Sequence, residues 1–222
     1  MAESWGSVLA DLIPLALVVA LSPLSIIPAV LVLHSARPRP TGLAFLTGWL
    51  VGLAALTAIF VGVSGLLGGF GETPTWAAWL RVVLGTALIL FGVYRFLTRT
   101  KSEHMPGFLT SLSKLSPVKA GAAGAALTVV NPKVLFICAA AGLAIGTAGL
   151  GQPDVWAAGI WYVVAAGSTV ALPILAYAVS GERLDPALTR LKAWMERNHA
   201  VLIAAILVVI GLLVLYKGIH AL

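Results

Sequence analysis

The chain has 222 residues, of which 60% are hydrophobic and only 10% are charged, and its mean hydropathy is +1.02. This balance excludes an ordinary soluble domain and indicates an integral membrane protein. The formal net charge of +6 does not indicate a nucleic-acid partner, because most of the basic residues are divided among three short polar segments between apolar stretches.

Apolar stretches of about 20 residues or more alternate with short polar breaks, which is typical of membrane-spanning helices. Strands of a membrane barrel would instead show alternating segments of roughly ten residues. The sequence therefore predicts an all-α integral membrane protein with six transmembrane helices. We expect them at residues 8–33, 42–67, 76–98, 119–147, 154–180 and 199–219.

The basic residues predict the orientation of these helices. Eleven of the fourteen Lys and Arg residues lie in the first, third and fifth loops, at 37–39, 95–119 and 183–197. By the positive-inside rule these loops are cytoplasmic and both termini are extracytoplasmic. The first residues carry Glu3 rather than a basic segment, so we expect no cleavable signal. The predicted location is the inner (plasma) membrane, as a multi-pass protein.

Two helix-start signals occur where helices should be uninterrupted. Ser22-Pro23 and Asn131-Pro132 lie near the middle of the first and fourth predicted spans. Ser or Asn caps free backbone N–H groups, and Pro suits the first helical position. Freed backbone groups are tolerated in a bilayer only where they are buried in protein or line a cavity. Interrupted helices 1 and 4, with a substrate-binding site near the membrane midplane, are therefore expected.

Lys133 follows the second signal directly and places a charge deep in an apolar stretch. Lys at the centre of a membrane helix costs about 2.5–3.5 kcal/mol even on a tolerant insertion scale, and such charges usually have a function or a partner. We expect Lys133 to contact substrate. The alternative is that both prolines only kink continuous helices and that Lys133 pairs structurally, for example with Asp11.

Short matches between the two halves indicate duplication. Ser22-Pro23 corresponds to Asn131-Pro132, Val63-Ser64-Gly65 to Val179-Ser180-Gly181, and Tyr94-Arg95 to Tyr216-Lys217. Because each half has an odd number of spans, the halves would be oppositely oriented, as in many secondary transporters. We expect one membrane domain with two inverted three-helix repeats. They cover residues 1–98 and 119–222 and are joined by a cytoplasmic linker at 99–118.

Three further patterns carry predictions. Ser168, Thr169 and Tyr177 form a polar stripe on the fifth span, suited to lining a substrate path or to ordinary interhelical hydrogen bonds. Leucines at helical spacing predict interfacial helices in the 99–118 linker and in the fifth loop, either as anchors or as contacts for anionic headgroups or a partner. The small residues of Gly48-x-x-x-Gly52 and Gly142-x-x-x-Gly146 indicate close helix packing, mostly within the chain; a homodimer seam is the alternative.

Catalytic and metal-binding signals are absent from the sequence. Cys138 is a lone cysteine, and the four histidines lack the clustered spacing of metal ligands. There is no Gly-rich phosphate loop. We therefore expect no enzymatic activity, no metal and no cofactor. The histidines, predicted in loops or at span ends, are His34, His104, His199 and His220.

The sequence as a whole resembles a known family. The Pro-rich break in the first span, the Arg37–Pro40 loop, the segment Ala44–Trp49, the segment Ser116–Ala120 and Asn131-Pro132-Lys133 occur together. In this combination the chain resembles the GAP family of glycolipid- or sulfolipid-addressing proteins within the LysE exporter superfamily. The resemblance implies movement of cell-envelope glycolipids towards the surface, whereas the wider superfamily exports amino acids and ions.

We therefore expect a transporter or transport accessory for a cell-envelope glycolipid or related amphiphile. One alternative is a small-solute exporter of the LysE type, for an amino acid or ion. Another is a non-transporting membrane scaffold for lipid-export machinery. The expected partners are membrane lipids or glycolipid cargo, and lipid-synthesis or export proteins that would bind the cytoplasmic loops.

Overall fold

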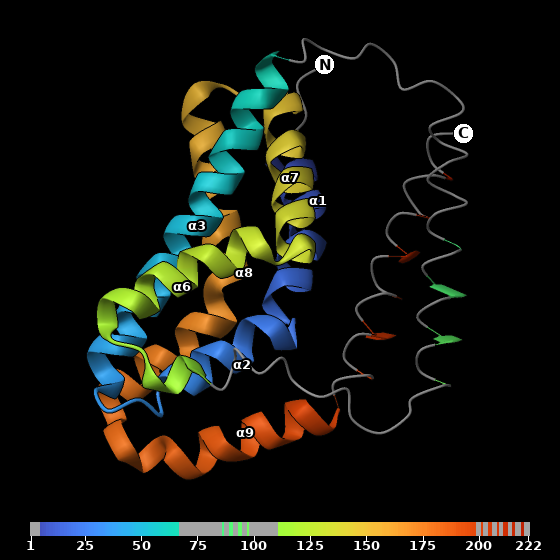
Figure 1. Cartoon of the computed structure of the whole chain (residues 1–222). Coiled ribbons are helices and arrows are strands. Elements are labelled where there is room, and N and C mark those ends of the chain that lie inside the picture. Colours follow the sequence, from blue (N-terminus) through green and yellow to red (C-terminus); the bar gives the residue numbers. More distant parts are fainter. Residues whose placement is uncertain are drawn as a thin grey trace.

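The computed structural model describes residues 5–66 and 111–198, together with isolated helical positions between 86 and 97 and between 201 and 219. In these ranges all regular structure is helical. Figure 1 shows long helices packed side by side, with one helix crossing their end. The helices are α1 (Trp5–Ala20), α2 (Pro23–Val32), α3 (Pro38–Leu66), the 3₁₀ turn η1 (Ser111–Lys114), α6 (Pro117–Val130), α7 (Pro132–Thr147), α8 (Gln152–Ser180), the 3₁₀ turn η2 (Gly181–Leu184) and α9 (Asp185–Arg197).

Four of the predicted spans correspond to these helices. The helices α3 and α8 have 29 residues each and are long and apolar enough to cross a membrane. The pairs α1–α2 and α6–α7 pass the same criterion as broken spans, bent by 51° and 72°. The other two predicted spans, 76–98 and 199–219, and residues 99–110 of the linker lie outside the continuously described ranges.

Both predicted interruptions are confirmed. Ser22 has φ −72° and ψ 122°, and Asn131 has φ −81° and ψ 102°, so each adopts extended backbone between two helices. Each precedes a proline, whose ring disfavours helical geometry at the preceding residue. Proline also lacks the N–H that would continue the first helix. The local sequence therefore produces full breaks rather than gentle kinks.

The long helices pack crosswise between the two halves of the chain. The helix α3 packs chiefly against α6 and α7, whereas α8 packs against α1 and α2, and α3 and α8 also contact each other. Each straight helix therefore lies mainly against the broken span of the other half.

Glycines create the close contact of α3 with α6 and α7. A side chain at Gly48 would collide with the backbone carbonyl of Gly121, and one at Gly52 would collide with Thr128. Without such glycines the backbones could not approach this closely, which is how small residues support helix packing in membranes. Both Gly-x-x-x-Gly motifs therefore face a neighbour within the chain. In the second motif, Gly142 lies against Phe60 and Gly146 against Ser64.

The two predicted interfacial segments differ in structure. Within the linker, Ser111–Lys114 forms a 3₁₀ turn rather than an α-helix, and Leu112 is buried against the core. The turn gives way to extended backbone at Ser116, which precedes Pro117. In the fifth loop the predicted helix is confirmed as α9, which lies across the end of α2 with Leu188 and Met195 buried.

Candidate functional site

The two helix breaks lie at a similar level of the molecule, on the side where α1 and α7 run next to each other (Figure 1). The helix α1, which ends at the first break, contacts α7, which starts at the second. Ser22 and Asn131 are both buried, at 2% and 6% relative exposure. Each break puts the carbonyl end of one half-helix next to the N–H end of the next, around one buried polar residue, an arrangement that serves as an ion or substrate site in transporters.

The first break is closed on one side by α8. The Oγ1 of Thr169 donates a hydrogen bond of 2.5 Å to the carbonyl oxygen of Ala20, the last residue of α1. On the other side, α2 starts with the N–H groups of Ser25 and Ile26 bonded to the Ser22 carbonyl at 2.9 and 3.3 Å. The Ser22 side chain makes no capping bond. Thr169 therefore satisfies a carbonyl that the break exposes.

The second break has a side-chain cap, as its sequence predicts. The Oδ1 of Asn131 accepts a hydrogen bond of 3.1 Å from the backbone N–H of Lys133. The carbonyl of Asn131 accepts the N–H of Leu135 at 3.0 Å, and Pro132 occupies the first helical position. The cap fixes the start of α7 and so the direction in which its positive dipole end points.

Lys133 is half-buried in the first turn of α7. Asp11, the alternative structural partner, lies on α1 eleven residues before Ser22, which is roughly 16 Å along a helix. Lys133 itself lies two residues after Asn131, so its backbone is part of the second break.

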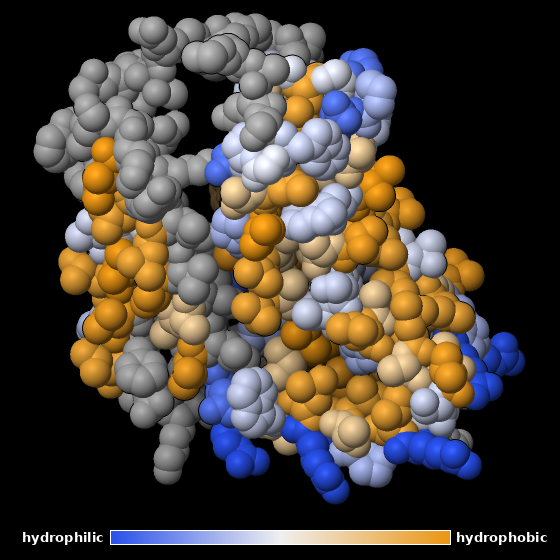
Figure 2. All heavy atoms as spheres, turned by 180° about the vertical axis from the view of Figure 1, so that it is seen from behind, coloured by the Kyte–Doolittle hydropathy of each residue, from blue (hydrophilic) through white to orange (hydrophobic). Residues whose placement is uncertain are grey.

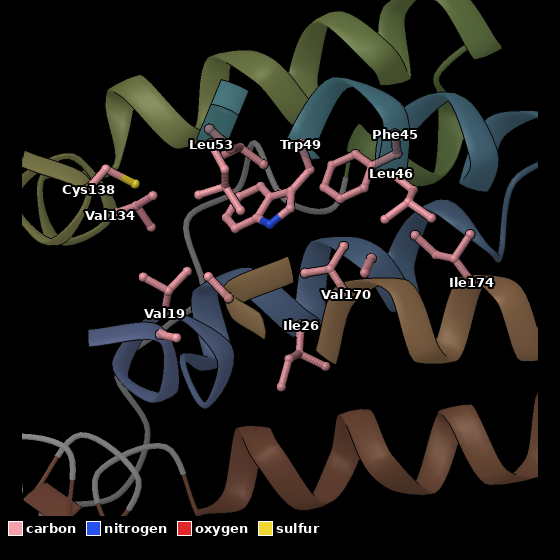
Figure 3. Packing of buried hydrophobic residues seen from close by; sticks show 14 of the residues in the cluster. Val19, Ile26, Phe45, Leu46, Trp49, Leu53, Val134, Cys138, Val170 and Ile174 are labelled. Carbon is pink, nitrogen blue, oxygen red and sulfur yellow. The ribbon is translucent and has the colours of Figure 1, made fainter. Parts of the chain in front are cut away.

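Two buried polar groups in this region were not predicted from the sequence to belong to the site. The indole Nε1 of Trp49 and the Oγ of Ser25 are fully buried, and no hydrogen-bond partner is found for them. Figure 3 shows the Trp49 ring among residues of both broken spans and α8, including Val19, Val134 and Val170. A buried donor without a partner costs about 1–3 kcal/mol. The sequence signal that could have indicated these two groups is the occurrence of a tryptophan and a serine inside otherwise apolar stretches.

The polar stripe on α8 divides into residues with different surroundings. Thr169 contacts the first break, as described above. The Oγ of Ser168 bonds to the carbonyl of Ala165 on its own helix at 2.7 Å. Tyr177 is buried but lies eight residues beyond Thr169, roughly 12 Å along α8. The structure therefore brings one stripe residue, Thr169, to a break, through an interhelical hydrogen bond.

An apolar groove with a volume of about 160 Å³ lies between α3 and α8. It opens at the surface of the described helices, because Trp156, Ile160 and Val164 on its wall are exposed. A groove of this kind fits an alkyl chain better than a polar solute. The α3 wall is formed by Ala54, Thr57, Ala58 and Val61, and the α8 wall also contains Val155, Gly159 and Val163.

Cys138 and His34 are residue types that act in catalysis in other proteins, but here each lies beside a group of the helix packing. Cys138 is buried, with its Sγ 3.7 Å from the hydroxyl of Tyr162. The Nδ1 of His34 lies 2.9 Å from the Val30 carbonyl at the end of α2. No group of three His, Cys, Asp or Glu residues within the described ranges could hold a metal ion. The other histidines, His104, His199 and His220, lie outside the described residues.

These features define a helical membrane protein in which two interrupted spans pack against two straight ones. The chain belongs to the family described as Sap, sulfolipid-1-addressing protein, which matches residues 12–220. The match covers both breaks and every helix from α2 to α9. Comparison with curated proteins and with solved structures gave no match.

Proposed function

We propose that the protein is an inner-membrane transporter or transport accessory that moves a cell-envelope glycolipid or related amphiphile towards the cell surface. The observation that carries the proposal is the presence of two broken spans with buried Ser22 and Asn131 at the breaks, the second followed directly by Lys133, in a chain whose family is described by sulfolipid addressing.

The site would hold the polar head of the cargo. The starts of α2 and α7 each provide backbone N–H groups and a positive dipole end, which favour an anionic group such as a sulfate. Lys133 adds a full positive charge, and Asn131 fixes the helix start that carries it. The buried Trp49 N–H and Ser25 hydroxyl are further hydrogen-bonding groups that a bound head could engage when the site opens.

The apolar groove between α3 and α8 supports an amphiphile over a small solute. A lipid needs a path for its alkyl chains along the side of the helices, and each buried CH₂ contributes about 0.8 kcal/mol. An exporter of amino acids or ions would need a closed aqueous path instead. The groove walls are apolar, with Thr57 as the polar residue among them.

We further propose that the complete chain has six spans in two inverted three-helix repeats, as in the LysE exporter superfamily. The crosswise packing supports this, because α3 on α6–α7 and α8 on α1–α2 are the reciprocal contacts that an inverted repeat would produce. We place both termini outside and the basic loops in the cytoplasm. A scaffold for lipid-export proteins, working through those loops, is the alternative function, and no enzymatic chemistry is proposed.

The test compares surface lipids of cells that carry the wild-type gene, no gene, or a variant. We expect loss of one surface glycolipid without the gene, and the same loss with Lys133→Ala at unchanged protein abundance. Lys133→Arg should restore function only partly, because a planar guanidinium does not reproduce a compact ammonium. The matched control is Lys119→Ala, which removes an exposed charge at the start of α6 and should leave lipid export normal.

Full lipid export by a stable Lys133→Ala protein would overturn the role of the charge. If abundance instead falls in Lys133→Ala and recovers in the double variant with Asp11→Ala, the lysine is a structural partner of that carboxylate. Unchanged surface lipids in cells without the gene, with altered export of amino acids or ions, would support the small-solute alternative.

A further inference from the structure

The outer flank of α9 has a regular pattern of cationic and aromatic side chains. Leu188 and Met195 are buried towards α2. Arg190, Trp194 and Arg197 follow one another at spacings of four and three residues, so they share one helix face, and all three are exposed. We call these three residues the α9 stripe.

The stripe and the leucine beside it expose apolar surface. Leu191 lies between the buried face and the stripe and is 38% exposed, and Trp194 is 52% exposed. An exposed Trp beside a Leu and two Arg residues is unfavourable in water but typical of a helix at the headgroup level of a membrane. The buried face already anchors α9 to the protein, so the stripe is not needed for that contact.

Basic residues outnumber acidic ones around α9. Figure 2 shows hydrophilic side chains projecting at the end of the molecule where α9 lies, below a broad hydrophobic surface. Arg39 approaches Gly181 at the start of η2, with its Nη2 3.3 Å from the position of an added Cβ. Lys114 and Lys119 are exposed near the start of α6. The two acidic residues of α9, Asp185 and Glu196, lie on the opposite flank of the helix from the stripe, by helical register.

We propose that the α9 stripe is a binding site for anionic phospholipid headgroups. Arg190 and Arg197 provide guanidinium groups for the phosphates, and Trp194 inserts its ring at the level of the glycerol and headgroups. Because α9 packs on α2, lipid bound here also holds the half-helix that starts at the first break. The site is separate from the cargo site, and its occupant is the surrounding membrane rather than the transported molecule.

The experiment uses the full-length protein in mixed micelles with either dioleoyl phosphatidylglycerol or dioleoyl phosphatidylcholine. Thermal unfolding gives the stabilisation by each lipid, and native mass spectrometry gives the number of lipids retained. We expect the anionic lipid to raise Tm more than the zwitterionic one. Arg190→Gln and Arg197→Gln should each weaken its apparent affinity about fivefold, the change that corresponds to ~1 kcal/mol per basic side chain near an anionic surface.

Two further variants distinguish lipid binding at this site from nonspecific attraction between anionic lipid and any exposed basic residue. Trp194→Ala keeps every charge and should still reduce retention of the anionic lipid. Lys119→Gln removes one exposed charge at the same end of the molecule but on α6 rather than on α9, and should change the affinity less than either arginine variant. Equal losses in the lysine and arginine variants, or undiminished stabilisation in the Arg190→Gln/Arg197→Gln double variant, would overturn the proposal. Surface lipid export in cells reports on the cargo site independently.

Discussion

At the scale of single residues, the first break depends on a hydroxyl from another helix. The end of α1 leaves carbonyl groups without helical partners, and the bond from Thr169 satisfies the last of them, at Ala20. In hydrocarbon no water replaces a lost partner, so an interhelical bond at this position stabilises the break directly. Ser168, the neighbouring residue, bonds within α8 and does not contribute to the break.

We therefore expect Thr169→Val to lower stability, because it keeps the shape of the side chain and removes only the donor. Interhelical hydrogen bonds in membrane proteins contribute ~0.6 kcal/mol on average and at most ~1.7 kcal/mol. Thermal unfolding of the detergent-solubilised protein measures the effect. Ser168→Ala is the matched control and should leave Tm nearly unchanged. Equal Tm values for wild type and Thr169→Val would show that the Ala20 carbonyl finds another partner.

At the scale of elements, the contact between α3 and the broken span α6–α7 depends on the absence of side chains. Gly48, Gly52 and Gly124 each lie where an added Cβ would collide with backbone or with a β-branched residue. Gly62 on α3 and Gly159 on α8 have nothing within 4 Å of that position. Glycines of both kinds therefore occur on the same helix, α3.

This difference predicts opposite effects of the same substitution. Gly48→Ala should destabilise the protein by a few kcal/mol, because the Gly121 carbonyl is backbone and α6 must move away. Gly62→Ala should be neutral or stabilise by roughly 0.5–1 kcal/mol, since Ala is the better helix former. Unfolding curves of both variants in detergent provide the measurement. A stable Gly48→Ala protein would mean that α3 and α6 pack less closely than described.

At the scale of the whole molecule, the described basic residues of the loops gather at one end. Arg37 and Arg39 precede or start α3, Lys114 and Lys119 flank the start of α6, and α9 crosses the same end. Asp154, in the first turn of α8, lies at the opposite end of that helix from α9. The loops that the charge pattern assigned to one side of the membrane are thus together in space.

Cysteine labelling tests the orientation. In a Cys138→Ala background, a cysteine at Gln152 should react with an impermeant reagent added to intact cells, and one at Lys114 should react only after permeabilisation. Both positions are exposed in the described structure, so access depends on the side of the membrane. The reverse labelling pattern would show that the basic end faces out and that the positive-inside assignment is wrong.

The sequence by itself determined the elements, because their signals are local. Long apolar stretches give helices in a bilayer, and Ser22-Pro23 and Asn131-Pro132 break them whatever surrounds them. The cap from Asn131 to Lys133 and the amphipathic α9 are likewise decided within a few residues. For this reason the ends of the predicted spans agree with those of α1–α2, α3, α6–α7 and α8 within about four residues.

Only the tertiary structure decided which elements meet. Nothing local to Thr169 indicates that its donor reaches Ala20, 149 residues away, and nothing local to Trp49 indicates that its N–H is buried without a partner. Likewise the glycine motifs predict close packing but not the neighbour, because a missing side chain specifies distance and not identity. Long-range packing, set by the shapes of all helices together, placed the two breaks at a similar level, where α1 and α7 contact each other.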